Sequence, residues 1–427
     1  MVDDIPVYNL KAVCKETGLT PATLRAWERR YGLIVPQRSS GGHRLYSRHD
    51  VDLLKWLVER QKEGLSISRA VEMWKKSGPF EQTLESHATR IISSTSESMM
   101  DELRNEWIDA CLALDDRAAN RILQQAFAIS QPEIVCLNVL QKGITQIGER
   151  WYARSATVQQ EHFASAIAIR RLDTLITSCA PPTRSGTILL ACPPGEEHDF
   201  ILLLVTYMLR RNGWNVLYLG ANVPISDLDA TIHSTNTSLV ISAAQTLYAA
   251  ASLAKMSEYL REQGVPLAYG GRIFQLIPEI TRQISGYYLN EDIASVTHQI
   301  ETLILNPPKM PLANPVSEDY AKTLVEYTHN VAAINTFLSS SIPTQDIQPV
   351  YKEIAISNFS RFITAALFLG NIHFMESSVT WLEGLLLNYD LDRSELERFF
   401  SSYRIAIEHY LGNNGSIILD WLSTLEL

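Results

Sequence analysis

The stretch TILLACPPGEEHDF, residues 187–200, decides how the middle of the chain is interpreted. Its apolar start is typical of a buried strand that ends at Pro-Pro-Gly, and the helical pattern FILLLVTYMLRRNG (200–213) follows. Ligands of such strand–loop–helix units bind at the carboxyl end of the strand, where this chain carries Glu196 and His198. A histidine that binds a metal through Nε2 usually donates its other ring N–H to a carboxylate, and Glu196 has suitable spacing. By itself, a Glu-x-His pair in a loop is a weak indication of a metal site.

The same texture continues downstream. Ser242 ends a later apolar run, and Gly270 and Gly271 follow another, where missing side chains would let a large ligand approach the backbone. Apolar runs alternate with helical segments, which predicts strand–helix–strand units and a parallel sheet. The runs are Thr187–Cys192, Trp214–Leu219, Leu239–Ser242 and Leu267–Tyr269.

An acid-x-His motif, then a serine, then Gly-Gly after successive strands resembles the cobalamin-binding domain of methionine synthase and its relatives. The resemblance implies that His198 displaces the dimethylbenzimidazole of the cofactor and becomes the lower cobalt ligand, with Glu196 beside it. Ser242, Gly270 and Gly271 would line the pocket for the displaced nucleotide tail. The family pattern has glycine where this chain has Ile201, a β-branched residue that could crowd the tail.

A helical pattern precedes the sheet, from about Met99 to Cys179. Its segment GERWYARSATVQQEHF (148–163) places Trp151 ten residues before Glu161, with His162 next. A buried tryptophan and an exposed Glu-His pair are the ordinary alternative. The segment resembles the cap bundle of CarH-type light-responsive regulators. That resemblance implies that Trp151 and Glu161 pack around a 5′-deoxyadenosyl group in the dark, and that His162 takes the cobalt once light removes the group.

The N-terminal part is basic although the chain is acidic. Residues 1–80 carry a net charge of +5 and the remainder −15, an asymmetry typical of a DNA-binding domain joined to a domain that does not bind DNA. In the stretch LTPATLRAWERRYGLIVPQRSSGGHRLY (19–46), Thr20-Pro21 predicts the start of a helix over Pro21–Tyr31, with Leu24 and Trp27 facing inward. A short helix and the turn at Gly18 precede it, and a hairpin around Gly41-Gly42 follows. This is a winged helix-turn-helix pattern, which fits the major groove.

The same stretch resembles the MerR family of regulators over about residues 7–75. A solvated charged face is the alternative to DNA contact. In the family, a long helix after this domain commonly forms the dimer. Here Gly78-Pro79 interrupts the helical pattern at that point, so we expect the protein to assemble through its cobalamin-binding region. The candidate contacts to double-stranded DNA are Thr23, Arg25, Arg29, Arg30, Tyr31, Arg38, His43, Arg44 and Tyr46.

The last 110 or so residues lie outside these resemblances. Beyond a proline-rich linker at Pro307–Pro315, Phe359, Phe362, Ile363, Leu367 and Phe368 predict a helical core. This segment has no cysteine, which excludes a thioether-linked haem or bilin. It is available for dimerisation, a protein partner or a further non-covalent ligand. Packing or surface roles are the ordinary interpretation of its His329, His373, Trp381, His409 and Trp421.

Other classes of protein are disfavoured. The five cysteines show no CxxC spacing and indicate a reduced, cytoplasmic protein. No apolar run reaches the ~20 residues that span a bilayer. No substrate module or further acid–base group suggests an enzyme.

We therefore expect a multidomain protein. Its parts are an all-α winged helix-turn-helix domain (5–78), an α-helical bundle capping cobalamin (85–180), a Rossmann-like, flavodoxin-like α/β cobalamin domain (184–305) and a C-terminal α-helical domain (316–427). The predicted function is a transcription regulator, a repressor in type, that binds a DNA operator as a homo-oligomer (dimer or tetramer). Adenosylcobalamin would control it through photolysis of the Co–C bond. A light-independent cobalamin sensor and a corrinoid-dependent methyl-transfer protein are the alternatives.

Overall fold

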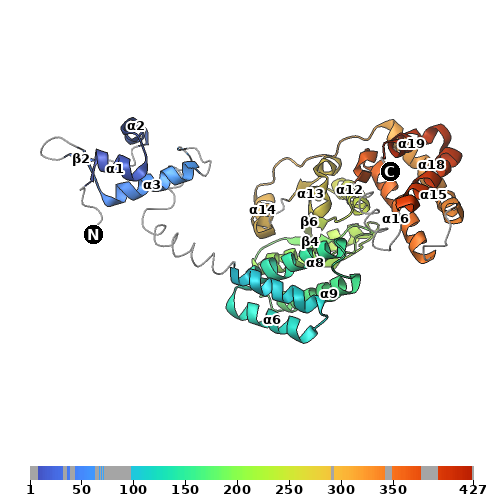
Figure 1. Ribbon diagram of the computed structural model, residues 1–427, viewed down its shortest axis with the longest axis horizontal. Coiled ribbons are helices and arrows are strands. Elements are labelled where there is room, and N and C mark those ends of the chain that lie inside the picture. The colour runs from blue at the N-terminus through green and yellow to red at the C-terminus, as the bar shows by residue number, and fades with distance from the viewer. Residues whose placement is uncertain are drawn as a thin grey trace. The chain divides into compact units, whose positions relative to one another are not determined.

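The computed structural model describes residues 8–31, 36–38, 44–62, 67, 69, 71, 98–289, 293–341, 349–376 and 393–425. Contacts divide the chain into two compact units, residues 1–99 and 100–427 (Figure 1). Each unit is described by itself. None of the helices in these ranges combines the length and hydropathy that crossing a membrane requires.

The first unit contains the predicted helix-turn-helix. Gly18, at φ +73°, ends the first helix, and Thr20 Oγ1 accepts a hydrogen bond from the backbone N–H of Thr23 (3.1 Å) at the start of the second. Leu24 and Trp27 are buried, as predicted. The strands pair antiparallel in the order β1-β3-β2. The elements are β1 (Tyr8–Asn9), α1 (Leu10–Thr17), α2 (Pro21–Tyr31), β2 (Gln37–Arg38), β3 (Arg44–Tyr46) and α3 (Arg48–Lys62).

Three predictions for this unit fall outside the described residues. They concern His43, the Gly41-Gly42 turn and the interruption at Gly78-Pro79.

The second unit begins with the helical bundle. Trp107, on the helix over 98–112, is fully buried against Gly143, where an added Cβ would lie 2.7 Å from the indole ring. The bundle core continues into Leu204 and Tyr207 of α10 (Phe200–Arg211), so the bundle packs on that helix of the α/β region. The other bundle elements are α6 (Asp116–Ile129), α7 (Pro132–Val135), the π-helix η1 (Cys136–Gln141), α8 (Lys142–Tyr152) and α9 (Val158–Thr177).

The α/β region has a five-stranded parallel sheet in the order β5-β4-β6-β7-β8. The alternating pattern predicted the parallel sheet, and this strand order is the flavodoxin-like one expected for the cobalamin domain. The fifth strand, β8, is only two residues long and was not predicted. The elements besides α10 are β4 (Thr187–Ala191), β5 (Asn215–Gly220), α11 (Leu228–Thr235), β6 (Thr237–Ala243), α12 (Leu247–Glu262), β7 (Leu267–Gly270), α13 (Arg272–Leu276), η2 (Pro278–Gln283), β8 (Tyr287–Tyr288) and α14 (Ile293–Leu305).

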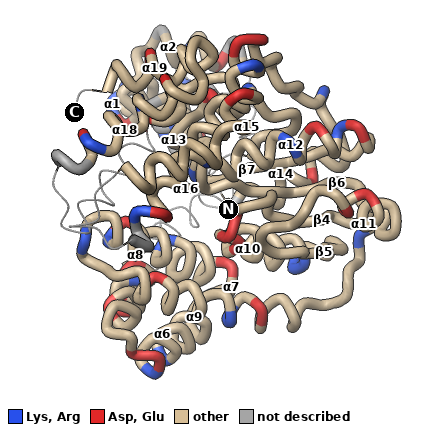
Figure 2. The backbone as a smooth tube through the Cα atoms, turned by 90° about the vertical axis from the view of Figure 1, so that its right-hand side faces the viewer, with Lys and Arg blue, Asp and Glu red and all other residues tan. Residues whose placement is uncertain are grey.

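Both faces of this sheet are covered, which is why its strands are apolar throughout. Along β4, Ile188 and Leu190 pack with α10 and α14, whereas Leu189 packs with α12. In Figure 2 the strands are accordingly almost free of charged residues.

The C-terminal helices continue the core of the α/β region. Phe359, Phe362, Ile363 and Leu367 are buried, as predicted, while Phe368 is partly buried. Trp421 lies in the same core, near Phe359. The elements are α15 (Glu318–Ser341), α16 (Pro349–Phe368), η3 (Ile372–Met375), α18 (Arg393–Leu411), η4 (Gly412–Gly415) and α19 (Ser416–Ser423).

The predicted linker has no helix or strand over residues 306–317, but it is fixed along the sheet edge. The carbonyl of Pro311 accepts from Gly286 N–H (3.0 Å), and Asn314 N–H donates to the carbonyl of Arg282 (2.8 Å). Ala313 N–H donates to Ser285 Oγ (3.0 Å). The segment therefore ties the C-terminal helices to the region around β8.

Gly271 gives a test of the packing at the end of β7. Its φ is +122°, and an added Cβ would lie 2.1 Å from the carbonyl oxygen of Ala244. We expect Gly271→Ala to lower the free energy of unfolding by more than the ~1–3 kcal/mol that unfavourable φ alone costs. Gly264→Ala is the matched control, because Gly264 has φ +72° but no heavy atom within 4 Å of the added Cβ. Urea unfolding measures both variants, and equal losses would contradict the predicted clash.

Candidate functional site

The candidate site lies at the carboxyl ends of β4 and β6. These strands are neighbours, but β4 is followed by α10 on one face of the sheet and β6 by α12 on the other. Ligands of open α/β sheets bind where the connections diverge in this way. The loop after β4 carries Glu196 and His198, and the loop after β6 carries Gln245.

Glu196 joins these two loops. Its carboxylate is 1% exposed and accepts three hydrogen bonds. Oε1 accepts from the backbone N–H of His198 (2.9 Å) and pairs with Nδ1 of its ring (2.7 Å), and Oε2 accepts from Gln245 N–H (2.6 Å). A buried carboxylate needs such partners, since each missing one leaves a desolvated acceptor.

His198 is held by one ring nitrogen and open at the other. The pair with Glu196 fixes Nδ1, while the side chain is 65% exposed. The hydrogen bond to Glu196 raises the pKa of His198 and burial opposes it; the charges of Glu196, Glu161 and Glu197 raise it further. This arrangement leaves Nε2 available as a ligand, in the orientation that a carboxylate partner imposes.

The remaining residues predicted for the nucleotide tail have contacts within the protein. Ser242 is buried, and its hydroxyl donates to the carbonyl of Ala191 (2.7 Å). Gly271 lets the backbone of Ala244 approach, whereas an added Cβ at Gly270 would meet only ordinary van der Waals contact. Ile201, half-buried in the first turn of α10, occupies the position where the family pattern has glycine.

Gln245 was not predicted as a site residue. Its Oε1 accepts from the backbone N–H of Arg272 (3.1 Å), which identifies the other terminal atom as nitrogen. That Nε2 is buried without a partner in the described structure. Only the position of Gln245 just after a predicted strand could have indicated this role from the sequence.

The bundle brings its predicted residues toward this edge. Glu161, in the first turn of α9, binds Ser165 Oγ (2.8 Å) and His162 Nδ1 (2.9 Å), and its charge acts on His198. His162 is 76% exposed on its side chain, so its Nε2 is open to solvent. The Glu161–His162 pair thus has the same carboxylate–imidazole relation as Glu196–His198.

An aromatic pair closes the end of α8. The rings of Trp151 and Tyr152 are 4.8 Å apart, and the guanidinium of Arg272 lies 5.3 Å from the Tyr152 ring centroid. Arg272 directly follows Gly271, so this contact connects the bundle to the loop after β7. The contact is a cation–π interaction, and such interactions are modestly stabilising when they are partly exposed.

The donor set fits a metal held in a macrocycle. Within the described ranges, no group of three or more His, Cys, Asp or Glu side chains is placed to hold a bare metal ion. His198 offers a single nitrogen, which suits an axial ligand to a metal whose equatorial ligands come from the cofactor. The unpartnered Nε2 of Gln245 would be satisfied by an oxygen acceptor such as an amide carbonyl. These residues therefore fit a corrinoid.

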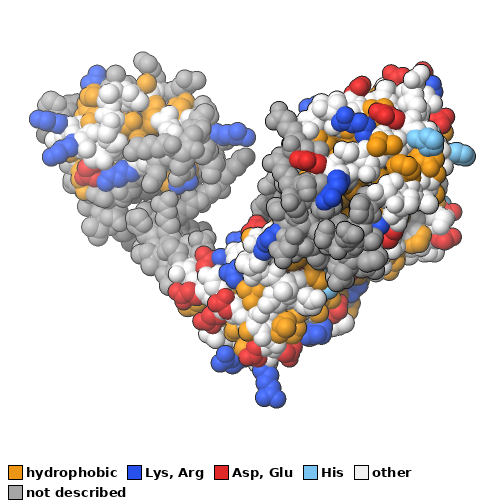
Figure 3. All heavy atoms as spheres, turned by 45° about the vertical axis from the view of Figure 1, so that its right-hand side comes forward, with side chains coloured by type: hydrophobic (Ala, Val, Ile, Leu, Met, Phe, Trp, Pro, Cys, Tyr) orange, Lys and Arg blue, Asp and Glu red, His pale blue; other side chains and the backbone are white. Residues whose placement is uncertain are grey.

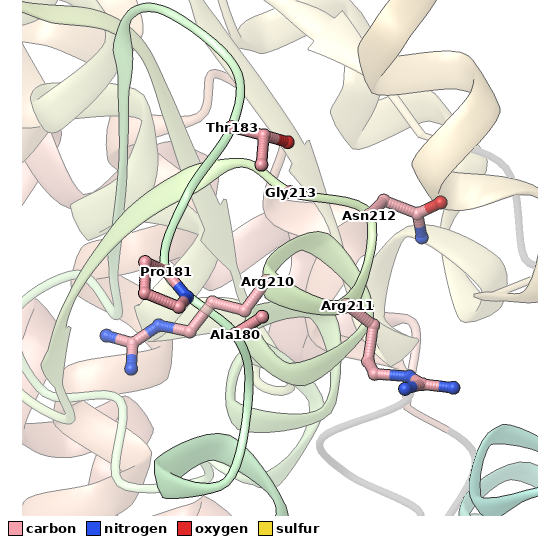
Figure 4. Close-up of a pocket in the computed structure, with 7 residues that line it drawn as sticks. All are labelled: Ala180, Pro181, Thr183, Arg210, Arg211, Asn212 and Gly213. Carbon is pink, nitrogen blue, oxygen red and sulfur yellow. The ribbon is translucent and has the colours of Figure 1, made fainter.

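A separate pocket of about 330 Å³ lies at the amino ends of the strands, opposite the candidate site, between the end of α10 and the start of β5. Figure 4 shows its two arginines, Arg210 and Arg211, pointing in different directions. Each has a partner: Arg210 donates to the carbonyl of Val216 (2.9 Å), and Arg211 pairs with Glu133 (2.8 Å). The arginines do not converge on a common ligand position.

The C-terminal histidines and tryptophans show no ligand arrangement among the described residues. His373 pairs with Glu376 (3.2 Å), His409 packs on Tyr410, and His329 is exposed. Trp421 is a core residue, and Trp381 lies outside the described ranges.

In the first unit, the predicted DNA contacts differ in exposure. Arg25 is exposed on α2, whereas Thr23 and Tyr31 are half-buried. Thr23 Oγ1 lies 2.8 Å from Thr20 Oγ1. Arg29 and Arg30 belong to α2 and Arg38 to β2.

Tyr46 corrects one expectation. It was predicted to be a surface residue that contacts DNA, but its side chain is fully buried. Its hydroxyl donates to Glu28 Oε1 (2.6 Å), and Glu28 Oε2 lies 3.4 Å from Arg44 Nε. Burial raises the pKa of Tyr46 most, and the hydrogen bond to Glu28 raises it further. The prediction was wrong because Glu28 on α2 supplies an acceptor that lets the phenol join the core.

Comparison with known families agrees with this architecture. A family described as "MerR HTH family regulatory protein" matches residues 8–76, and one described as "B12 binding domain" matches residues 103–176. The chain is thus a helix-turn-helix regulator that carries a B12-binding domain. Among solved structures, a Methanosarcina barkeri monomethylamine corrinoid protein aligns with a TM-score of 0.38 and 18% identity, covering 47% of this chain and 97% of that one.

Two transcription regulators match about half of this chain. The HTH-type transcriptional repressor CarA of Myxococcus xanthus is 33% identical over 222 residues, 52% of this chain and 70% of CarA. The repressor CarH of the same organism is 33% identical over 226 residues, 53% of this chain and 74% of CarH. The chain belongs to the family of MerR-type, B12-domain regulators that includes CarA and CarH. CarA and CarH are transcription regulators and not enzymes.

Glu196 is testable through the titration of His198. We expect Glu196→Gln to lower the pKa of His198, because the variant loses the charge and the hydrogen bond that raise it. Glu197→Gln is the control, since Glu197 contributes least to the shift. Ring signals of the histidine in a pH titration by NMR measure both. Equal pKa values in the two variants would contradict the assigned role of Glu196.

Proposed function

We propose that this protein is a DNA-binding repressor whose oligomeric state is controlled by bound adenosylcobalamin and by light. The observation that carries the proposal is the Glu196–His198 pair. A buried, fully hydrogen-bonded carboxylate orients an exposed imidazole at the carboxyl edge of a flavodoxin-like sheet. Such an imidazole is suited to hold the cobalt of a bound cobalamin.

Residues of the α/β region and of the bundle would together hold a bound cobalamin. When bound, adenosylcobalamin supplies a Co–C bond that light can break. His198 would hold the cobalt, and Gln245 Nε2 would donate to a cofactor oxygen. Trp151 and Glu161 would pack around the adenosyl group, since an indole offers a flat apolar surface to an adenine. His162, whose Nε2 is open to solvent, would be the second residue able to hold the cobalt.

In this proposal, the strength of DNA binding depends on the oligomeric state. The bundle that carries His162 shares its core with α10, so a change in what His162 binds would move helices that pack together. If this shift weakens the oligomer, several DNA-binding units no longer act together. Loss of multivalency costs roughly 10²–10⁴ in avidity without any change in base contacts.

The first test combines absorption spectra with size-exclusion chromatography of the protein and adenosylcobalamin, before and after green light. We expect retained corrinoid in the dark, and a changed spectrum and elution volume after illumination. Absence of retained corrinoid would overturn the sensor. An unchanged spectrum and size would overturn the light switch and favour a light-independent cobalamin sensor.

Substitution of each of the two histidines should have a different effect in this assay. His162→Ala should bind in the dark as the parent does and lose the stable illuminated adduct. His198→Ala should weaken dark binding by at least about 10-fold, because the lower ligand is lost. Two variants that behave like the parent would show that both ligand assignments are wrong.

DNA contact is tested by salt dependence. Arg25 is exposed on α2, and Arg25→Ala should weaken binding to a generic duplex and lower the slope of log K against log salt by about 1. Lys55→Gln is the control, because the ammonium of Lys55 already pairs with Glu16 (2.6 Å). Fluorescence anisotropy measures both, and an equal slope in the two variants would place Arg25 away from the phosphates.

A further inference from the structure

The C-terminal helices meet the cofactor region through α12 and α16. The rings of Tyr248 and Phe362 are 5.6 Å apart, and the guanidinium of Arg361 lies 4.0 Å from the Tyr248 ring centroid. Seven residues further along both helices, Lys255 Nζ lies 4.8 Å from the ring of Phe368. The two helices therefore run side by side in the same direction, with a cation on an aromatic ring at each end of the contact.

Only the first of these contacts adjoins the candidate site. Gly195 stands directly before Glu196, and a Cβ added to it would lie 3.0 Å from Arg361 Nη2 and 3.6 Å from the Tyr248 ring. Gly195 has φ +84°, and its N–H donates to Asn222 Oδ1 (2.8 Å). Arg361 and Tyr248 thus cover the outside of the loop turn that carries Glu196.

The segment that leads into α12 also holds Glu196. Gln245, whose N–H binds Glu196 Oε2, stands two residues before the start of α12. Arg361 is exposed. Among the described residues, its guanidinium makes a cation–π contact with the Tyr248 ring. No carboxylate of the described residues forms an ion pair with it, so its position is set by the ring and the loop and not by a competing charge.

We infer that Arg361 is a positioning residue for the lower cobalt ligand: stacked on Tyr248, it holds the Gly195 turn so that Glu196 keeps His198 aimed at the metal. This rests on the proposed function. It gives the C-terminal domain a part in the corrinoid site, through a contact with no equivalent in a chain that lacks α16.

The test uses the full-length protein, labelled with ¹⁵N-histidine and loaded with cob(II)alamin. All samples carry His162→Ala, so that the upper histidine cannot compete. Electron paramagnetic resonance then reports the lower ligand, because an axial ¹⁵N splits each cobalt line into a doublet, whereas the ¹⁴N of dimethylbenzimidazole gives a triplet. Far-UV circular dichroism checks that each variant folds.

We expect a clear doublet in the starting protein. Arg361→Gln should lower the equilibrium constant for histidine ligation by about 10-fold, in the range seen when groups that orient a ligand are changed. Arg361→Lys, which keeps a cation for the Tyr248 ring, should recover part of the doublet. Lys255→Gln is the matched control, because it removes a cation–ring contact from the same helix pair far from the Gly195 turn, and it should keep the doublet.

Two results would overturn the inference in distinguishable ways. Equal doublets in Arg361→Gln and Lys255→Gln would show that Arg361 only contributes to domain packing, and the proposed function would stand. A starting protein without any doublet would show that His198 is not the lower ligand, and both proposals would fall.

Discussion

A carboxylate taken out of water is the constraint on which the α/β region depends. Glu196 stays buried only because donors from two loops converge on it, one set from the turn after β4 and one from the backbone before α12. The three bonds join the two strands at the point where the chain diverges to opposite faces of the sheet. They also determine which nitrogen of His198 faces outward. A packing requirement and a ligand orientation are thus met by the same side chain.

Much of the fold could be predicted because its determinants are local. Thr20 and Gly18 mark helix ends within a few residues, and the strands β4 to β7 show as apolar runs between helical patterns. The exceptions depend on distant partners. β8 exists because Tyr287 and Tyr288 pair with β7, and two residues carry no periodic pattern. Tyr46 is buried because Glu28, distant in sequence, accepts a hydrogen bond from its hydroxyl.

The same distinction separates the predicted from the unpredicted parts of the site. Glu196 and His198 stand two residues apart, and Glu161 and His162 are adjacent, so each pair is visible in the sequence. Gln245 meets Glu196 across 49 residues, and Arg361 meets the Gly195 turn from a different helical domain. Neither residue type signals a site when it stands alone. The assignment of Ser242 to a ligand pocket likewise missed its bond to Ala191, which only the pairing of β4 with β6 creates.

The linker over residues 306–317 and the core shared by α12 and α16 join the α/β region and the C-terminal helices into one compact unit (Figure 1). On the face drawn in Figure 3, hydrophobic side chains are scattered among polar and charged ones, as expected where apolar surface is already buried inside. A cavity made near Phe359 therefore lowers the population of the folded α/β region as well as that of its own domain. Mutations far from any cofactor contact can in this way reduce the fraction of molecules able to respond, by cooperativity alone.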